Sequence, residues 1–224
     1  MSLAPASLLQ LIWLASPALP VGGFAYSEGL EAAVDSASVH DEASAGDWLV
    51  DQLHLGLARS ELPLVAAALD AARRGDAARL QALADWQLQT RESSELRGQS
   101  DQMGRSMVDW LRTQGHTLTP PLPAPCPWPV AFAIAAAART TAEPLEVLIA
   151  FGFSWAENQV QAALKAAALG QSAGQRILAR LAQDLPAVAE AALAIGDDER
   201  QAFTPGLAIA SARHETQYSR LFRS

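Results

Sequence analysis

The last stretch of the chain, residues 211–224, carries the side chains best suited to bind another protein. Arginines alternate there with aliphatic and aromatic residues: Arg213, Tyr218, Arg220, Leu221, Phe222 and Arg223. Such residues dominate binding hot spots because they combine a large contact area with directional hydrogen bonds. The stretch is basic, with Glu215 as its one acidic side chain, although the whole chain has a formal net charge of -8. We interpret it as a partner-binding tail that is mobile in the free protein. The alternative is an ordinary helix end, where arginine complements the helix dipole.

A loop containing prolines and glycines, residues 16–31, precedes the second predicted helix. Gly22 and Gly23 allow a positive φ angle or the close approach of another chain. The glycine pair could also cradle a phosphate, but the loop lacks the Lys-Ser/Thr of a P-loop and follows no predicted strand. On spacing alone, an ordinary turn is the better interpretation.

A polar stretch in the middle of the chain, residues 90–106, indicates a second contact surface. It carries three arginines and two glycines: Arg91, Arg97, Arg105, Gly98 and Gly104. A helix that faced only solvent would not need so many residues that weaken it. Lys165 is a further candidate, because it is a lone cation near the end of an apolar helix. Its position also fits a favourable interaction with the helix dipole, so the pattern leaves both roles open.

Groups that could catalyse a reaction or bind a metal are dispersed. The histidines are His40, His54, His116 and His214. None of them pairs at ligand spacing with another histidine or with the one cysteine, Cys126. Residues 152–155 lack the second glycine of a nucleophile elbow. We therefore predict no catalytic residue, no metal ligand and a protein that is not an enzyme. A helical enzyme of unknown reaction is the alternative.

Helices must position these side chains, because the composition favours helices over strands. Hydrophobic residues make up 50% of the chain, much of it alanine, and aromatic residues make up 6%. Apolar residues recur at helical spacing, as at Leu49, Leu53 and Leu57. We predict an all-α, single-domain bundle of roughly eight to ten helices over residues 1–224. The expected helices cover residues 8–13, 28–37, 45–60, 61–74, 76–111 with a break, 130–139, 144–169 and 172–195.

A proline-rich connection, residues 120–129, separates two helical halves. Six of its ten residues are proline, which excludes a helix interior or a central strand. Helices on the two sides can still share one core, so the connection does not require two domains.

The charge balance and the cysteine count restrict partners and location. Lysine and arginine number 16 against 24 acidic residues, which argues against general binding to nucleic acid. The apolar run at residues 8–14 lacks the basic flank of a signal peptide, and no run approaches the roughly 20 apolar residues of a membrane span. One cysteine excludes an internal disulfide and suits a reducing compartment. We expect a cytoplasmic protein that binds neither nucleic acid nor membrane.

In the four segments that contain these candidate residues, the chain resembles the urease accessory protein F family. The matching segments are LPVGGFAYSEGLE at residues 19–31, TRESSELR with the following GRS in residues 90–106, LKAAALGQSAGQ at residues 164–175, and SARHETQYSRLFRS at residues 211–224. The tail is the most specific of the four. Through these segments the resemblance implies partner-binding roles for Gly22, Gly23, Glu31, Lys165, Gln171, Arg213, His214, Glu215, Tyr218 and Arg220.

The resemblance also implies an all-helical, dimeric, non-enzymatic chaperone for nickel insertion into urease. Family members bridge a scaffold protein called D or H, which contacts apo-urease, and a nickel-carrying GTPase called G, whose GTP hydrolysis they regulate. No stably bound cofactor is expected, because the complex handles the nickel. Arg220 or Arg97 could act as an arginine finger on the GTPase, although docking is the more usual role of an exposed arginine. His214 and Cys126 are not assigned as nickel ligands.

Overall fold

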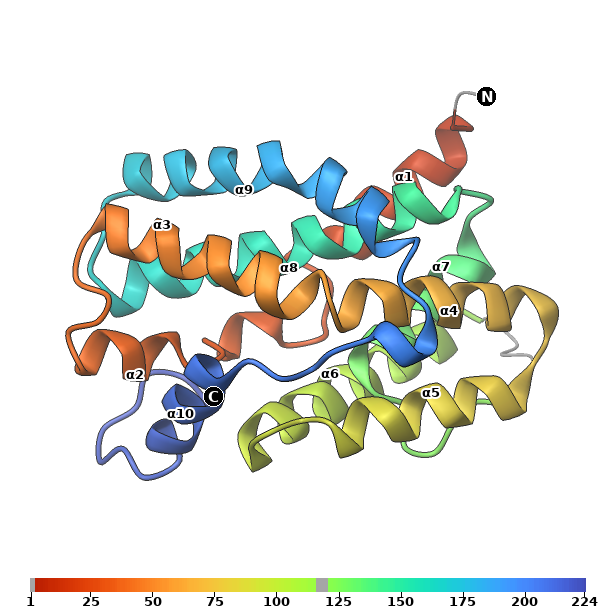
Figure 1. Cartoon of the computed structure of the whole chain (residues 1–224). Helices are drawn as coiled ribbons and strands as arrows, with labels where there is room; N and C mark the ends of the chain where they lie inside the picture. The colour runs from red at the N-terminus through yellow and green to blue at the C-terminus, as the bar shows by residue number, and fades with distance from the viewer. Residues whose placement is uncertain (1–2, 116–120) are drawn as a thin grey trace.

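The computed structural model describes residues 3–115 and 121–224, which form ten α-helices and no strand (Figure 1). The helices are α1 Pro5–Ala15, α2 Leu30–Asp35, α3 Glu42–Asp51, α4 Glu61–Arg74, α5 Ala77–Gln89, α6 Ser94–Thr113, α7 Trp128–Arg139, α8 Pro144–Ala166, α9 Gln171–Ala192 and α10 Pro205–His214. Two 3₁₀ turns, Gly23–Ala25 and Asp197–Glu199, and a π-helical turn, Gln52–Leu57, are also present. The prediction of an all-α bundle of eight to ten helices is confirmed. Within the described ranges, no helix has the length and apolarity needed to cross a membrane.

Local signals set the boundary between α4 and α5. Gly75 follows α4 with a φ of 73°, the left-handed conformation that glycine adopts most easily. The side chain of Asp76 then caps α5 by accepting a hydrogen bond from the backbone N–H of Arg79 at 2.9 Å. Ser60 stands at the N-cap of α4, but its hydroxyl donates to the carbonyl of Gly56 at 3.0 Å and does not cap the helix.

The single helix predicted over residues 45–60 forms two segments in the structure. α3 starts earlier because Asp41 and Ser44 form a capping box, with the Ser44 N–H donating to Asp41 at 2.8 Å. After α3 the backbone widens into the π-helical turn, which periodicity does not reveal. The apolar face predicted for this region, Leu49, Leu53 and Leu57, is buried as expected.

The centre of the bundle is formed by α7 and α8. Every residue of α7 from Trp128 to Ala136 is buried. α8 packs against α9, α4, α2 and α1, so the helix over residues 144–166 lies at the centre of the bundle, where the sequence predicts it. Phe151 of α8 meets Phe132 of α7 edge to face, with ring centroids 5.1 Å apart, a favoured arrangement of aromatic rings.

The proline-rich connection is irregular from residue 121 to residue 127 and lies directly on α6. A Cβ atom at Gly104 would collide with the carbonyl oxygen of Cys126, so glycine permits this close packing. Gly104 is therefore buried, which corrects its expected place on a contact surface. Helices before and after the connection contribute to one hydrophobic core. His116 and Pro120 lie outside the described residues.

The tail folds back onto the body of the protein (Figure 1). α10, which the sequence analysis does not predict, packs against α2, and the C-terminus lies beside both helices. Ser211, His214, Phe222 and Ser224 are buried. In the structure, polar groups of α2 and α6 hold the tail in place, and the mobility expected in the free protein stays a prediction.

Candidate partner-binding surface

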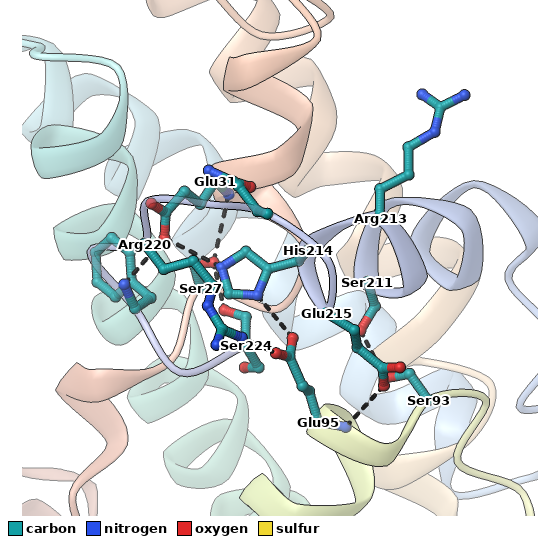
Figure 2. Close-up of polar contacts among 12 residues, drawn as sticks. Ser27, Glu31, Ser93, Glu95, Ser211, Arg213, His214, Glu215, Arg220 and Ser224 are labelled. Atoms are coloured by element: carbon teal, nitrogen blue, oxygen red, sulfur yellow. Dashed lines mark hydrogen bonds and ion pairs between the residues drawn. The ribbon is translucent and has the colours of Figure 1, made fainter.

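Glu31, in the first turn of α2, receives the end of the tail (Figure 2). Its carboxylate accepts the backbone N–H of Leu221 at 2.7 Å and that of Phe222 at 2.9 Å. It also lies 3.2 Å from Nε2 of His214. Glu31 is 7% exposed and His214 is completely buried. Both residues thus position the tail from inside the protein, and their expected partner-binding roles stay predictions.

Glu95, in the first turn of α6, forms the other wall of this cluster. One of its oxygens lies 2.7 Å from Nδ1 of His214, and the other lies 2.7 Å from the guanidinium of Arg220. Arg220 is thus already ion-paired within the chain. Sequence reasoning missed Glu95, although it lies in the polar stretch, because its two partners lie 119 and 125 positions later.

Glu215 attaches the tail to the start of α6. Its carboxylate accepts the backbone N–H of Ser94 at 2.8 Å and the Ser94 hydroxyl at 2.6 Å. The first amides of a helix have no partner within the helix, and the helix dipole favours a negative charge beside them. The hydrogen bond from the Ser94 side chain lowers the pKa of Glu215 below its ordinary value.

The last two residues join the glycine-containing loop to α6. The carbonyl of Ser224 accepts the backbone N–H of Ser27 at 2.8 Å and the Ser27 hydroxyl at 2.5 Å. The hydroxyl of Ser224 donates to Gln99 of α6 at 2.8 Å. The N–H of Arg223 donates to the carbonyl of Ala25 at 2.9 Å. Tail, loop and α6 therefore form one hydrogen-bonded unit.

The side chains on the outside of this unit form what we call the tail surface: Arg213, Tyr218, Arg220 and Leu221. Tyr218 is fully exposed and Leu221 is 72% exposed. Arg213 points away from the buried cluster in Figure 2. Phe222, expected to bind a partner, is buried and is not part of this surface. The structure thus holds the tail backbone in place and leaves the side chains of Arg213, Tyr218 and Leu221 exposed, while Arg220 is ion-paired with Glu95.

The two loop glycines serve different purposes. Gly22 has a φ of 80°, which the sequence analysis allowed. Gly23 is buried without a positive φ, and a Cβ there would lie 2.7 Å from Nδ2 of Asn158. The chain that approaches Gly23 is therefore α8 of this protein. Phe24, which follows, is exposed and is absent from the predicted sites.

A polar group of residues lies beneath the loop. Arg91, expected on a contact surface, is largely buried in an ion pair with Glu61, and burial lowers the pKa of Arg91. Glu28 has a φ of 51° and accepts hydrogen bonds from Trp155 at 3.0 Å and Gln99 at 2.7 Å. Arg91 is thus an internal residue, and Glu28, which sequence reasoning missed, ties the loop to α6 and α8.

The remaining predicted residues are exposed. Arg97 and Arg105 are on the outer side of α6, where Arg105 pairs with Asp101 at 3.0 Å. Lys165 and Gln171 flank the turn between α8 and α9, which we call the connection surface. In Figure 1 this turn lies at the left end of the bundle, on the side of α2.

A third exposed surface, absent from the predicted sites, is apolar. α1 exposes Leu8, Leu9, Ile12 and Trp13. Leu8 and Ile12 border an open hollow of about 500 Å³, together with Ile149 and Phe153 of α8. We call this the α1–α8 face. The sequence indicates this face, because α1 has more apolar residues than one buried stripe of a helix can contain.

Within residues 3–115 and 121–224, no group of three or more His, Cys, Asp or Glu side chains could hold a metal ion. Burial raises the pKa of the Cys126 thiol to about 12, so the metal-binding thiolate does not form near neutral pH.

Comparison with known proteins agrees with the resemblance found in the sequence. The family model UreF matches residues 39–182. A urease accessory protein UreF from Polaromonas sp. (strain JS666 / ATCC BAA-500) is 60% identical over 225 residues, covering 99% of this chain and 97% of that protein. The UreF of Paracidovorax citrulli (strain AAC00-1) is also 60% identical, covering 99% of this chain and 91% of that protein. A bifunctional urease accessory protein UreEF from Bordetella bronchiseptica is 45% identical, over 100% of this chain and 53% of that protein. The chain therefore belongs to the UreF family of urease accessory proteins.

Proposed function

We propose that this protein assists the maturation of urease by bridging the accessory scaffold protein D or H and the nickel-carrying GTPase G. The protein acts as a chaperone in the cytoplasm, and the complex rather than this chain handles the nickel. The observation that carries the proposal is the tail surface, in which exposed hot-spot residues are held on an anchored backbone. A surface fixed before binding loses little conformational entropy on association, which favours a specific interaction.

A bridging protein needs two surfaces that can be occupied at once. The tail surface is built from α10 and the residues after it, whereas the connection surface lies at the turn between α8 and α9. We assign one partner to each. The relative from Bordetella bronchiseptica is described as a bifunctional urease accessory protein UreEF, and this chain matches about half of it. The other half of that protein supports the proposal that this chain acts together with other accessory proteins.

We further propose that the protein is a homodimer and that two copies meet at the α1–α8 face. The exposed side chains of α1 and the apolar lining of the hollow, Ile149 and Phe153, support this choice. Contiguous apolar patches on soluble proteins commonly mark interaction sites. Ile12→Arg should convert the dimer to a monomer in light scattering at constant helix content, whereas Leu193→Arg, at an exposed leucine after α9, should leave the dimer intact.

Regulation of the GTPase is proposed to arise from docking and not from an inserted arginine. Arg220 is ion-paired with Glu95, so the insertion of its guanidinium into the GTPase would break that ion pair. Arg97, by contrast, makes no ion pair within the described residues, and it remains available as a docking contact.

Co-purification tests the proposal. The tagged protein is expressed with proteins D or H and G, with and without nickel and GTP, and urease activation is measured in the same cells. The variants are Lys165→Ala, for the connection surface, and the pair Tyr218→Ala and Leu221→Ala, for the tail surface. Each folded variant should lose one partner, keep the other and fail to activate urease. Retention of both partners by both variants would refute the assignment of the partners to these two surfaces, and failure of the native protein to hold D or H and G in one complex would refute the bridging role.

A further inference from the structure

A small polar cavity lies beneath the glycine-containing loop, where the loop meets α6 and α8. Gly23 and Glu28 of the loop line it, together with residues of the two helices. The space in it that the centre of a water molecule can reach is about 30 Å³. One buried water needs about 10 to 15 Å³ of such space. The cavity therefore has room for about two water molecules.

Two polar side chains of α8 line this cavity without a hydrogen-bond partner. Gln159 is 3% exposed and Ser154 is 6% exposed. Neither side chain forms a hydrogen bond to any residue within 3–115 and 121–224. A buried amide or hydroxyl that exchanges its hydrogen bonds with water for none is costly, so native proteins satisfy such groups with protein atoms or with bound water.

The other walls of the cavity add further donors and acceptors. Ser100 of α6 is 4% exposed, and its hydroxyl has no partner in the described part of the chain; the same holds for Nε of Arg91. The carboxylate of Glu28 accepts hydrogen bonds from Trp155 and Gln99. A carboxylate has about four acceptor positions, so Glu28 can accept from water as well. A buried water typically has two to four polar partners, and these walls supply that number.

We propose that this cavity is a hydration site, in which about two water molecules join Gln159 and Ser154 of α8 to the polar groups of α6 and of the loop. Water fits the lining better than a cation does, because the amide of Gln159 and Nε of Arg91 offer N–H donors beside the acceptors. The waters thereby support the loop from beneath, in addition to the direct hydrogen bonds that Glu28 accepts. The hydration site is a property of the free protein and does not rest on the proposed function.

A crystal structure of the full native chain, at a resolution that shows surface waters, tests the site directly. We expect electron density inside the cavity at hydrogen-bonding distance, about 2.7 to 3.2 Å, from the amide of Gln159 or the hydroxyl of Ser154. An empty cavity in a map that shows surface waters would overturn the proposal. Density whose contacts to oxygen are all about 2.3 to 2.6 Å would also overturn it, because such distances are typical of a metal cation.

Magnetic resonance tests the same site in solution. Water held in the cavity should transfer magnetisation to the indole proton of Trp155, which lines the cavity and donates to Glu28 at 3.0 Å. The buried Trp110, which does not line the cavity, is the internal control and should receive none. Gln159→Met keeps an unbranched side chain but removes its polar atoms, so the transfer to Trp155 should be largely lost. Gln161→Met, at an exposed residue of the same helix, should leave the transfer unchanged.

Absence of the transfer in the native chain, or equal transfer in the native chain and in Gln159→Met, would overturn the proposal. Ser154→Ala provides the same comparison if the methionine disturbs the packing of α8, because alanine only removes the second hydroxyl partner on that helix. Circular dichroism establishes that each variant keeps the native helix content. None of these measurements includes a partner, so the result is independent of the bridging function.

Discussion

The carboxylate of Glu31 accepts the backbone N–H of Leu221 at 2.7 Å, across a sequence separation of 190 residues. This contact joins the second helix of the chain to its end. The same carboxylate accepts the next backbone N–H and faces His214, so one buried group organises three points of the tail. The anchoring of the tail therefore depends on an interaction within the chain and does not require a partner.

Glu31→Gln should lower the free energy of unfolding by about 2 kcal/mol, because hydrogen bonds to a charged group typically contribute about 1.5 to 3 kcal/mol. The amide keeps one acceptor but loses the negative charge that faces His214. Denaturant titration measures the change. The matched control is Glu42→Gln, which removes an exposed ion pair with Arg176 and should lower the free energy of unfolding much less. Equal losses in the two variants would contradict the anchoring role of Glu31.

The parts of the fold that the sequence predicted are those set by neighbouring residues. Gly75 and Asp76 mark a helix end and a helix start because their backbone and side chain act within one turn. Leu49 and Leu53 reveal a buried face through helical spacing. Glu95 could not be found in this way, because its partners are distant in sequence. For the same reason, the sequence does not reveal that Glu31 and His214 contact each other inside the protein.

The two glycines of α6 show why residue type alone misleads. Gly98→Ala should stabilise the protein by about 0.5 to 1 kcal/mol, because alanine favours a helix and nothing lies near its added Cβ. Gly104→Ala should destabilise it by about 1 to 3 kcal/mol, because the added atom collides with the backbone at Cys126. Thermal melting of the two variants measures opposite shifts. Shifts of the same sign would contradict the packing of the proline-rich connection on α6.

Cys126 should be unreactive in the native protein. Burial raises the pKa of its thiol to about 12, and the thiolate is the reactive form. At about pH 8 the ionised fraction is then about one in ten thousand, so a thiol reagent should modify the native chain orders of magnitude more slowly than the chain unfolded in denaturant. Absorbance of the released chromophore follows both reactions. Comparable rates would show that the proline-rich connection opens readily and exposes the thiol.

Substitutions of exposed residues on the tail surface test partner binding without disturbing the fold. Deletion of residues 211–224 would remove the buried His214 and Phe222, so a loss of partner binding after deletion could reflect unfolding. Combined Tyr218→Ala and Leu221→Ala replacements avoid that problem, because both side chains are exposed and surface substitutions usually change stability by less than about 0.5 kcal/mol.

If these residues are hot spots, each truncation costs about 1 to 4 kcal/mol of binding free energy, and the pair should lower affinity at least about thirtyfold. Titration calorimetry with the purified scaffold protein D or H, and separately with GTPase G, measures the loss. Phe203→Ala is the matched control, because Phe203 is an exposed aromatic residue before α10 and outside the tail surface. Unchanged affinity of the double variant for both proteins, with an unchanged melting temperature, would place the recognition surface elsewhere on the molecule.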